Sequence, residues 1–255
     1  MDRSDPVIAR VQDDIGEITL NRPSAMNAIT IELAEELERA LLELEPAVRV
    51  ITIRGAGGNF CAGGDIGQLA ALRAEGAAAT APLFEAFESA CERIGQLSVP
   101  VLSVVAGYAM AGGFELMQAS DLAIVANDAV IGDYHLNFGQ IPAGGGSQRL
   151  PRLVGRQRAS AHILAGDRLT GAEAVEWGLA YVAVPATELE AAASQLAQRL
   201  ADKPPLAMTR AKRLIRDGLE LSLRDGLALE RRVVLEHMAS DEVAAGIARF
   251  AAKER

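Results

Sequence analysis

The 255-residue chain has few of the residues that build disulfide frameworks and metal centres, with only two cysteines and three histidines. Cys61 and Cys91 lack both the short spacing of metal ligands and the number that a disulfide scaffold requires, so we expect two reduced, packed thiols. His162 and His237 have no second histidine or cysteine at helical spacings of three or four residues. We therefore predict no metal site and interpret these two histidines as structural.

Long hydrophobic runs and an excess of positive charge are also missing. Although half of the residues are apolar, no run approaches the roughly 18 to 20 uncharged apolar residues that span a bilayer. The formal net charge of −9 argues against a nucleic-acid partner, because a phosphate backbone demands a basic face. The segment Met1–Pro6 lacks the basic and apolar regions of a secretory signal. We expect a soluble, cytoplasmic protein that binds neither membrane nor nucleic acid.

Alternating β-branched runs and helical patterns predict an α/β fold. Helical spacing of apolar residues begins at Thr30, and a second helical region, Ala77–Leu97, is interrupted by Pro82. The expected strands, of which the first two form a hairpin, are Val7–Gln12, Asp14–Leu20, Val48–Arg54, Val101–Val105 and Asp121–Val125.

The last quarter of the chain is predicted to be a helical region. Upstream of it, Thr170 and Glu173 have the spacing of a capping box that opens a helix. The helical pattern that follows is broken at Pro204-Pro205. We place the boundary at this break, with a spiral core over residues 1–203 and a C-terminal helical region over residues 204–255.

Two glycine-rich segments, Asn59–Ile66 and Val105–Leu116, each follow a buried-strand pattern and lead into a helical pattern. Such turns expose backbone N–H groups, and a helix start adds unpaired amides and the positive end of its dipole. Two of them aimed at one point form a pocket for a developing oxyanion. Neither segment contains the dinucleotide-binding fingerprint, since Phe60 stands where a third glycine belongs after Gly55 and Gly57. A dehydrogenase is therefore disfavoured.

These two segments, together with Leu20–Ala28 and Ile141–Leu150, closely resemble the enoyl-CoA hydratase/isomerase family, the crotonases, in colinear order over nearly the whole chain. The resemblance implies an α/β fold with a crotonase-like ββα spiral core and a C-terminal helical trimerisation region. It also implies an oxyanion hole for acyl-CoA thioesters, a homotrimer or a dimer of trimers, and no cofactor beyond the coenzyme A of the substrate.

The resemblance assigns site residues by their positions in the motifs. The backbone N–H groups of Gly64 and Gly112 are the implied oxyanion donors, and Glu115 matches one of the two hydratase glutamates. The second glutamate is missing, because His135 stands seven residues before Pro142, where the hydratases carry it. An imidazole can give or take a proton near neutral pH, so His135 is the second candidate catalytic residue. The implied substrate-binding residues are Ala25, Ala62, Asp65, Ile66 and Gly144.

Each of these assignments has a structural alternative. Glu115 in the first turn of a helix also complements the helix dipole, and Asp65 is expected to cap the helix that follows it. A lone loop histidine such as His135 is often structural, and Asp133 and Tyr134 flank it in positions suited to orient it. Five basic residues are interpreted as a solvated helix face, with a smaller chance that one binds the 3′-phosphate of coenzyme A: Lys203, Arg210, Lys212, Arg213 and Arg216.

The favoured function is an acyl-CoA-processing crotonase of the hydratase/isomerase type, which transfers protons and adds water at a thioester-conjugated double bond through an enolate. A C–C bond hydrolase acting on a β-dicarbonyl compound is the alternative, because some such family members place histidine in the region of His135. They do not generally keep the glutamate matched by Glu115. A non-catalytic or RNA-binding homologue is a further alternative, which Glu115 and the acidic composition disfavour.

Overall fold

The centre of the molecule is a six-stranded sheet. The computed structural model describes residues 5–253, so the first four residues of Met1–Pro6 lie outside the described residues. The first two strands form the expected antiparallel hairpin, and all the later strands are parallel to their neighbours. In spatial order the strands are β1 (Val7–Gln12), β2 (Ile15–Leu20), β3 (Val50–Gly55), β4 (Val101–Val105), β6 (Leu122–Ala126) and β9 (Val182–Val184).

A second, three-stranded sheet gives the fold its spiral. It contains β5 (Tyr108–Met110), β7 (Val130–Gly132) and β8 (Leu169–Thr170). The chain passes from β4 in the large sheet to β5 in the small one and then into a helix, and it repeats the step from β6 to β7. The predicted ββα spiral is therefore confirmed.

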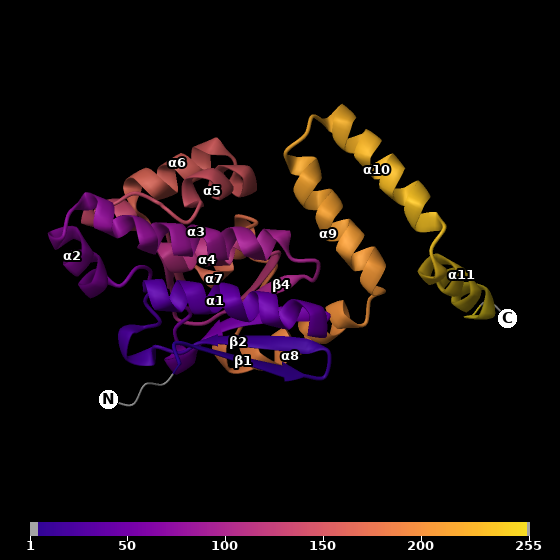
Figure 1. Ribbon diagram of the computed structural model, residues 1–255, viewed down its shortest axis with the longest axis horizontal. Helices are drawn as coiled ribbons and strands as arrows, with labels where there is room; N and C mark the ends of the chain where they lie inside the picture. The colour runs from indigo at the N-terminus through magenta and orange to yellow at the C-terminus, as the bar shows by residue number, and fades with distance from the viewer. Residues whose placement is uncertain (1–4, 254–255) are drawn as a thin grey trace.

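Amphipathic helices cover the large sheet. Helix α1 (Ile31–Leu44) begins where the hydroxyl of Thr30 accepts a hydrogen bond from the N–H of Leu33, and its apolar stripe packs on β1, β2 and α3 (Ala81–Gln96) (Figure 1). Helix α8 (Leu189–Ala201) packs on β2, β3, β4 and β6. The remaining helices of this part are α2 (Ile66–Ala74), α4 (Gly112–Ala119), α5 (Gly146–Val154), α6 (Arg156–Ala165) and α7 (Gly171–Glu176).

Two local predictions concern helix starts. The capping box is confirmed, because the Thr170 hydroxyl accepts from the Glu173 N–H while the Glu173 carboxylate accepts from the Thr170 N–H. The expected interruption is found immediately before Pro82, between Thr80 and Ala81. Residues 77–80 form a separate 3-10 turn, and Pro82 lies in the first turn of α3, where a helix needs no N–H donor.

The C-terminal helices extend away from the two sheets (Figure 1). They are α9 (Pro205–Leu219), α10 (Leu223–Met238) and α11 (Asp241–Lys253), and α10 packs beside α9. The predicted break at Pro204-Pro205 is confirmed as the junction between α8 and α9. Between residues 5 and 253 no helix is both long and apolar enough to cross a membrane.

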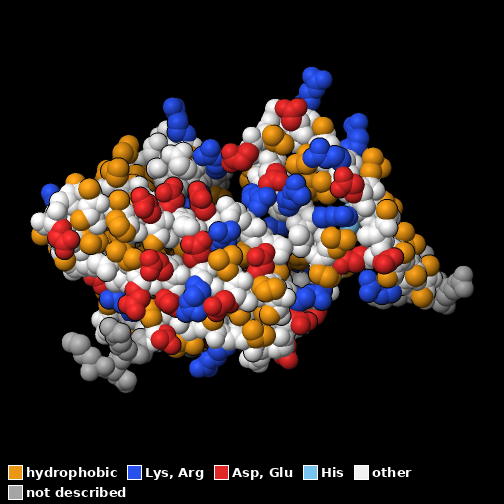
Figure 2. Space-filling view, in the orientation of Figure 1, with side chains coloured by type: hydrophobic (Ala, Val, Ile, Leu, Met, Phe, Trp, Pro, Cys, Tyr) orange, Lys and Arg blue, Asp and Glu red, His pale blue; other side chains and the backbone are white. Residues whose placement is uncertain are grey.

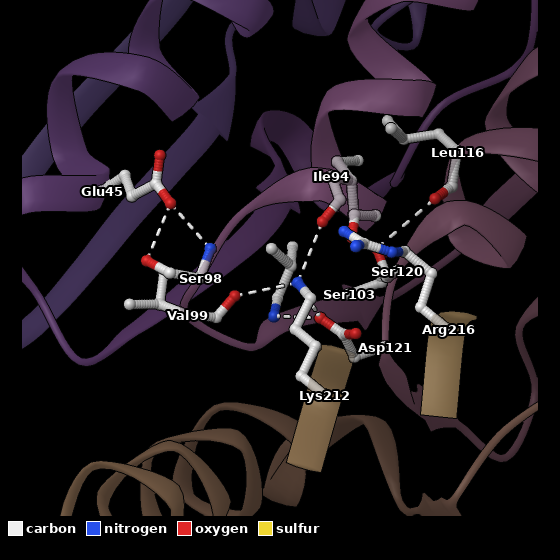
Figure 3. Close-up of polar contacts among 12 residues, drawn as sticks. Glu45, Ile94, Ser98, Val99, Ser103, Leu116, Ser120, Asp121, Lys212 and Arg216 are labelled. Carbon is white, nitrogen blue, oxygen red and sulfur yellow. Dashed lines mark hydrogen bonds and ion pairs between the residues drawn. The ribbon is translucent and has the colours of Figure 1, made fainter. Parts of the chain in front are cut away.

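Lys212 joins α9 to the core, and its interpretation as part of a solvated face is wrong (Figure 3). Its side chain is buried, and its ammonium donates to the carbonyl oxygens of Ile94 and Val99 at 2.9 Å each. It also binds Oδ2 of Asp121 at 2.7 Å, and the same oxygen accepts from the N–H of Val101 at the start of β4. All three ammonium protons are therefore used in fixing α9 against the end of the sheet.

Replacing Lys212 with methionine should lower the free energy of unfolding by about 3 kcal/mol, because two carbonyls lose their donor and Asp121 loses its cation. Denaturant unfolding followed by circular dichroism measures the change. Lys203→Met is the matched control: this lysine is exposed, so the expected change is below about 0.5 kcal/mol. Equal stability of the two variants would contradict the anchoring role of Lys212.

Candidate active site

The two glycine turns predicted from the sequence meet in the structure. Gly64 directly precedes Asp65, whose carboxylate caps α2 by accepting from the Gln68 N–H at 3.0 Å. Gly112 is the first residue of α4. A Cβ placed on the neighbouring Gly63 would lie only 3.5 Å from the backbone nitrogen of Gly112, so the turns are in contact. Among residues 5–253 neither the Gly64 N–H nor the Gly112 N–H has a hydrogen-bond acceptor.

The second turn is held by the strained backbone conformation of Ala111 and by a close contact between Gly113 and Cys61. Ala111 has φ 48° and ψ −118°, a conformation that residues other than glycine rarely adopt, and its N–H donates to the Gly132 oxygen at 2.8 Å. A Cβ on Gly113 would lie 2.1 Å from the carbonyl oxygen of Cys61, so only glycine allows α4 to start this close to the first turn. The position of the Gly112 N–H is therefore fixed by the backbone itself.

Both glycines line a cavity of about 730 Å³ that also contains Glu115 and His135. Its size is that of a small-molecule site. Its apolar wall is not evident from the sequence, because the spacing that marks an apolar helix face is the same whether that face meets a core or a cavity. This wall includes Ile29, Leu69, Leu83, Phe84, Phe87, Phe138 and Ile141.

A second cavity, of about 390 Å³, shares Gly64 and His135 with the first. Four of the five residues expected to bind substrate line it: Ala25, Ala62, Asp65 and Ile66. The fifth, Gly144, lines neither cavity, and its binding of substrate stays a prediction. Its backbone N–H donates to Oε1 of Glu115 at 2.7 Å.

Glu115 is a buried carboxylate held by a backbone clamp. Its side chain is 1% exposed, and Oε1 accepts from the N–H groups of Gly144 and Gly146 at 2.7 and 2.8 Å. Burial raises the pKa of Glu115 above its ordinary value, although these two amides and His135 oppose the shift. A carboxyl group with a raised pKa is suited to exchange protons near neutral pH.

His135 lies beside the free oxygen of this carboxylate. Its Nε2 is 3.6 Å from Oε2 of Glu115, and its Nδ1 is 3.0 Å from Oδ1 of Asp133. The structure thus brings the two candidate catalytic residues together in the lining of the cavity, and Asp133 contacts the other nitrogen of the imidazole. The other two histidines line neither cavity: His162 is buried between the rings of Phe114 and Trp177, and the His237 ring contacts Arg210.

The two cysteines are free and buried, as expected. Burial raises the pKa of the Cys61 thiol to about 12, so it is unreactive although it lies next to the first glycine turn. Asp65 serves structure as well as lining the second cavity, because it forms an ion pair with Arg22 at 2.8 Å besides capping α2.

Comparisons with known proteins show which family the chain belongs to. The family described as enoyl-CoA hydratase/isomerase matches residues 10–255. The chain belongs to the enoyl-CoA hydratase/isomerase family. A probable enoyl-CoA hydratase of Mycobacterium leprae is 34% identical over 98% of this chain and 96% of its own length. The mitochondrial enoyl-CoA hydratase of Pongo abelii is 31% identical over 94% of this chain and 82% of its own length.

Solved structures of the hydratase/isomerase family show the same fold. The crystal structure of an enoyl-CoA hydratase from Bacillus anthracis has a TM-score of 0.92 and 32% identity, covering 97% of this chain and 96% of that one. An enoyl-CoA hydratase from Polaromonas has a TM-score of 0.94 and 29% identity, covering 97% of each chain. The protein is therefore a crotonase-fold enzyme of the hydratase/isomerase family.

Replacing Glu115 with glutamine should stabilise the fold at neutral pH but not in acid. The amide keeps an oxygen for the Gly144 and Gly146 N–H groups and removes a charge that burial penalises. Because the folded-state pKa of Glu115 is raised, its stabilising contribution is present below its ordinary value of 4.5 and lost as the pH rises through the raised value. Melting temperatures should show an advantage of the variant that grows with pH.

The control for this measurement is Glu92→Gln, which changes an exposed carboxylate on α3. Its melting-temperature difference from the wild type should stay nearly constant over the same pH range. An equally constant difference for Glu115→Gln would show that the pKa of Glu115 is not raised in the folded enzyme.

Proposed function

We propose that this enzyme adds water across the α,β double bond of an acyl-CoA thioester. The observation that carries the proposal is the 3.6 Å separation of Glu115 Oε2 and His135 Nε2, in the cavity lined by Gly64 and Gly112. Two atoms at this separation can each lie about 2.8 Å from one water oxygen, which is a normal hydrogen-bond distance. A shared water is then positioned to attack a substrate held by the glycine turns.

The proposed reaction follows from these positions. The thioester oxygen accepts from the N–H groups of Gly64 and Gly112, which stabilise the negative charge of the enolate. The water oxygen forms a bond to Cβ as its proton passes to one member of the Glu115–His135 pair, and the π electrons move toward the thioester oxygen. The other member gives a proton to Cα, so the pair holds the same number of protons before and after. No cofactor beyond the coenzyme A of the substrate enters these steps.

The two cavities suggest where the parts of the substrate lie. The larger one is walled by apolar and aromatic side chains, which supports an apolar acyl group. The smaller one contains Ala25, Ala62 and Ile66, and we assign it to the pantetheine arm of coenzyme A. The thioester then lies at Gly64, which lines both cavities.

A second candidate reaction is hydrolysis of a C–C bond in a β-dicarbonyl substrate. The observation in its favour is the carboxylate of Asp133 behind His135, an arrangement suited to activating water for attack on a carbonyl carbon. Glu115 has no evident task in that reaction, whereas hydration needs two proton-transfer groups. Hydration is therefore the favoured proposal.

We also propose that the C-terminal helices bind further copies of this chain, as a homotrimer or a dimer of trimers. Several large apolar side chains on these helices are exposed, and Figure 2 shows hydrophobic side chains on the surface of this part. A surface of this kind is typical of an interface between protein chains. The exposed residues include Ile215, Leu219, Leu223, Leu227, Leu235, Met238, Ile247 and Phe250.

The purified enzyme should hydrate crotonyl-CoA, measured by the loss of the absorbance of the conjugated thioester. His135→Ala and Glu115→Gln should each lower kcat by about 10²- to 10⁴-fold, because each removes one proton-transfer group. His135→Glu should retain more hydration than His135→Ala, since it restores a carboxyl group. Products are separated by mass spectrometry. Undiminished hydration by His135→Ala, or cleavage of a β-dicarbonyl thioester without any hydration, would contradict the proposal.

Gly64 allows the oxyanion assignment to be tested with a matched pair of variants. Gly64→Pro removes the N–H, and kcat should fall by about 10²- to 10³-fold, the effect of losing one oxyanion donor. Gly64→Ala keeps the N–H, and its Cβ would have no protein atom within 4 Å, so the fold should tolerate it and kcat should fall far less. Similar kcat values for two folded variants would exclude the Gly64 N–H as a donor.

A further inference from the structure

We propose that Asp133 is a positioning residue that keeps the proton of His135 on Nδ1, so that Nε2 is the atom that exchanges protons with water and Glu115. This inference rests on the proposed function for the reaction, but its structural part concerns the free enzyme. Asp133 is fully buried, and Oδ1 is 3.0 Å from Nδ1 of His135 and 3.4 Å from the His135 backbone nitrogen. Both nitrogens therefore face one oxygen.

The chemistry of this contact determines which imidazole nitrogen carries the proton. An ionised carboxylate only accepts hydrogen bonds, so Nδ1 must carry the proton that lies between the two groups. In a neutral imidazole only one nitrogen is protonated, which leaves a lone pair on Nε2; in the charged form both nitrogens are protonated. In either form, Nε2 is the nitrogen whose proton changes during the reaction, and it is the nitrogen that faces Glu115.

The backbone holds Asp133 and His135 in this relation. Asp133 directly follows β7, and Tyr134 then turns the chain in the left-handed region with φ 60° before His135 begins a 3-10 turn. The Tyr134 ring lies 4.3 Å from the guanidinium of Arg168 and packs edge-on against Phe138. The turn is thereby fixed from outside, while its two neighbours point into the protein.

In the described part of the chain, His135 is the only residue that hydrogen-bonds to the Asp133 carboxylate, and both contacts are made to Oδ1. Among residues 5–253, Oδ2 is buried and has no hydrogen-bond partner. A Cβ on Gly146 would lie 3.4 Å from this oxygen and 3.1 Å from Oε1 of Glu115, so the two carboxylates flank one backbone position. The His135 ring thus lies between these two carboxylates, and Asp133 is placed to stabilise the charge that forms when Nε2 takes a proton.

The first experiment determines the position of the proton without substrate. The chain has only three histidines, so the imidazole nitrogens of ¹⁵N-histidine-labelled enzyme can be resolved by two-dimensional NMR, and loss of one set in His135→Gln assigns His135. We expect Nδ1 of His135 to be protonated in the wild type at every pH where the fold is intact. A neutral His135 with the proton on Nε2 and a bare Nδ1 would overturn the proposal, whatever reaction the enzyme catalyses.

The second experiment measures the kinetic role of the carboxylate. Asp133→Asn keeps the shape and removes the charge, so kcat for crotonyl-CoA hydration should fall by about 10²- to 10⁴-fold with KM changed less than about threefold. Asp128→Asn, an exposed aspartate in the turn before β7, is the control and should keep wild-type kinetics. A folded Asp133→Asn enzyme with wild-type kcat would overturn the proposal.

The two experiments separate this inference from the proposed reaction. If the wild type hydrates no enoyl thioester, the hydration proposal fails, while the NMR measurement still decides where the His135 proton lies. If Asp133→Asn does not fold, the NMR measurement on the wild type decides alone. A change in KM without a change in kcat would assign Asp133 to substrate binding and would contradict its positioning role.

Discussion

The structure of the site depends on one close backbone contact, between the start of α4 and the turn that follows β3. The carbonyl of Cys61 occupies the space that a side chain at residue 113 would need, so the contact exists only because Gly113 has none. This contact sets the first turn of α4 beside Gly64, which places both free N–H groups on the same cavity. It also fixes Glu115, which lies in that first turn. The positions of the two proposed oxyanion donors and of one proposed acid–base group therefore follow from a single packing requirement.

Burial of charge is the second constraint, and it acts against stability. Glu115 is held in an apolar environment by two backbone N–H groups, which satisfy one carboxylate oxygen and leave the other directed at His135. Such a group is costly to ionise, and the same cost raises its pKa above the ordinary value. By contrast, Lys212 uses all three of its donors in structural contacts, which hold α9 against the core.

The features predictable from sequence are those encoded by neighbouring residues. The strands, the Thr170 capping box, the Asp65 cap and the glycine turns all depend on short-range patterns, and the structure contains each of them. The candidate acid–base pair is identified through family motifs rather than from the chemistry of the chain alone. Burial of Lys212 and the role of the Gly144 N–H were missed, because both depend on partners 29 or more residues away. Nothing local distinguishes such residues from solvated ones.

The histidine at position 135, where the family resemblance implies a second glutamate, has a simple electrostatic consequence. A carboxyl group carries no charge when protonated and one negative charge when ionised. A histidine alone carries one positive charge or none, but His135 together with the carboxylate of Asp133 again carries no charge or one negative charge. The pair thus reproduces the charge of a carboxyl group in both protonation states, with Nε2 as the exchanging atom. With a neutral residue at position 133, a protonated His135 would be a cation beside the cavity. Histidine is therefore electrostatically equivalent to a carboxyl group here only because Asp133 is present.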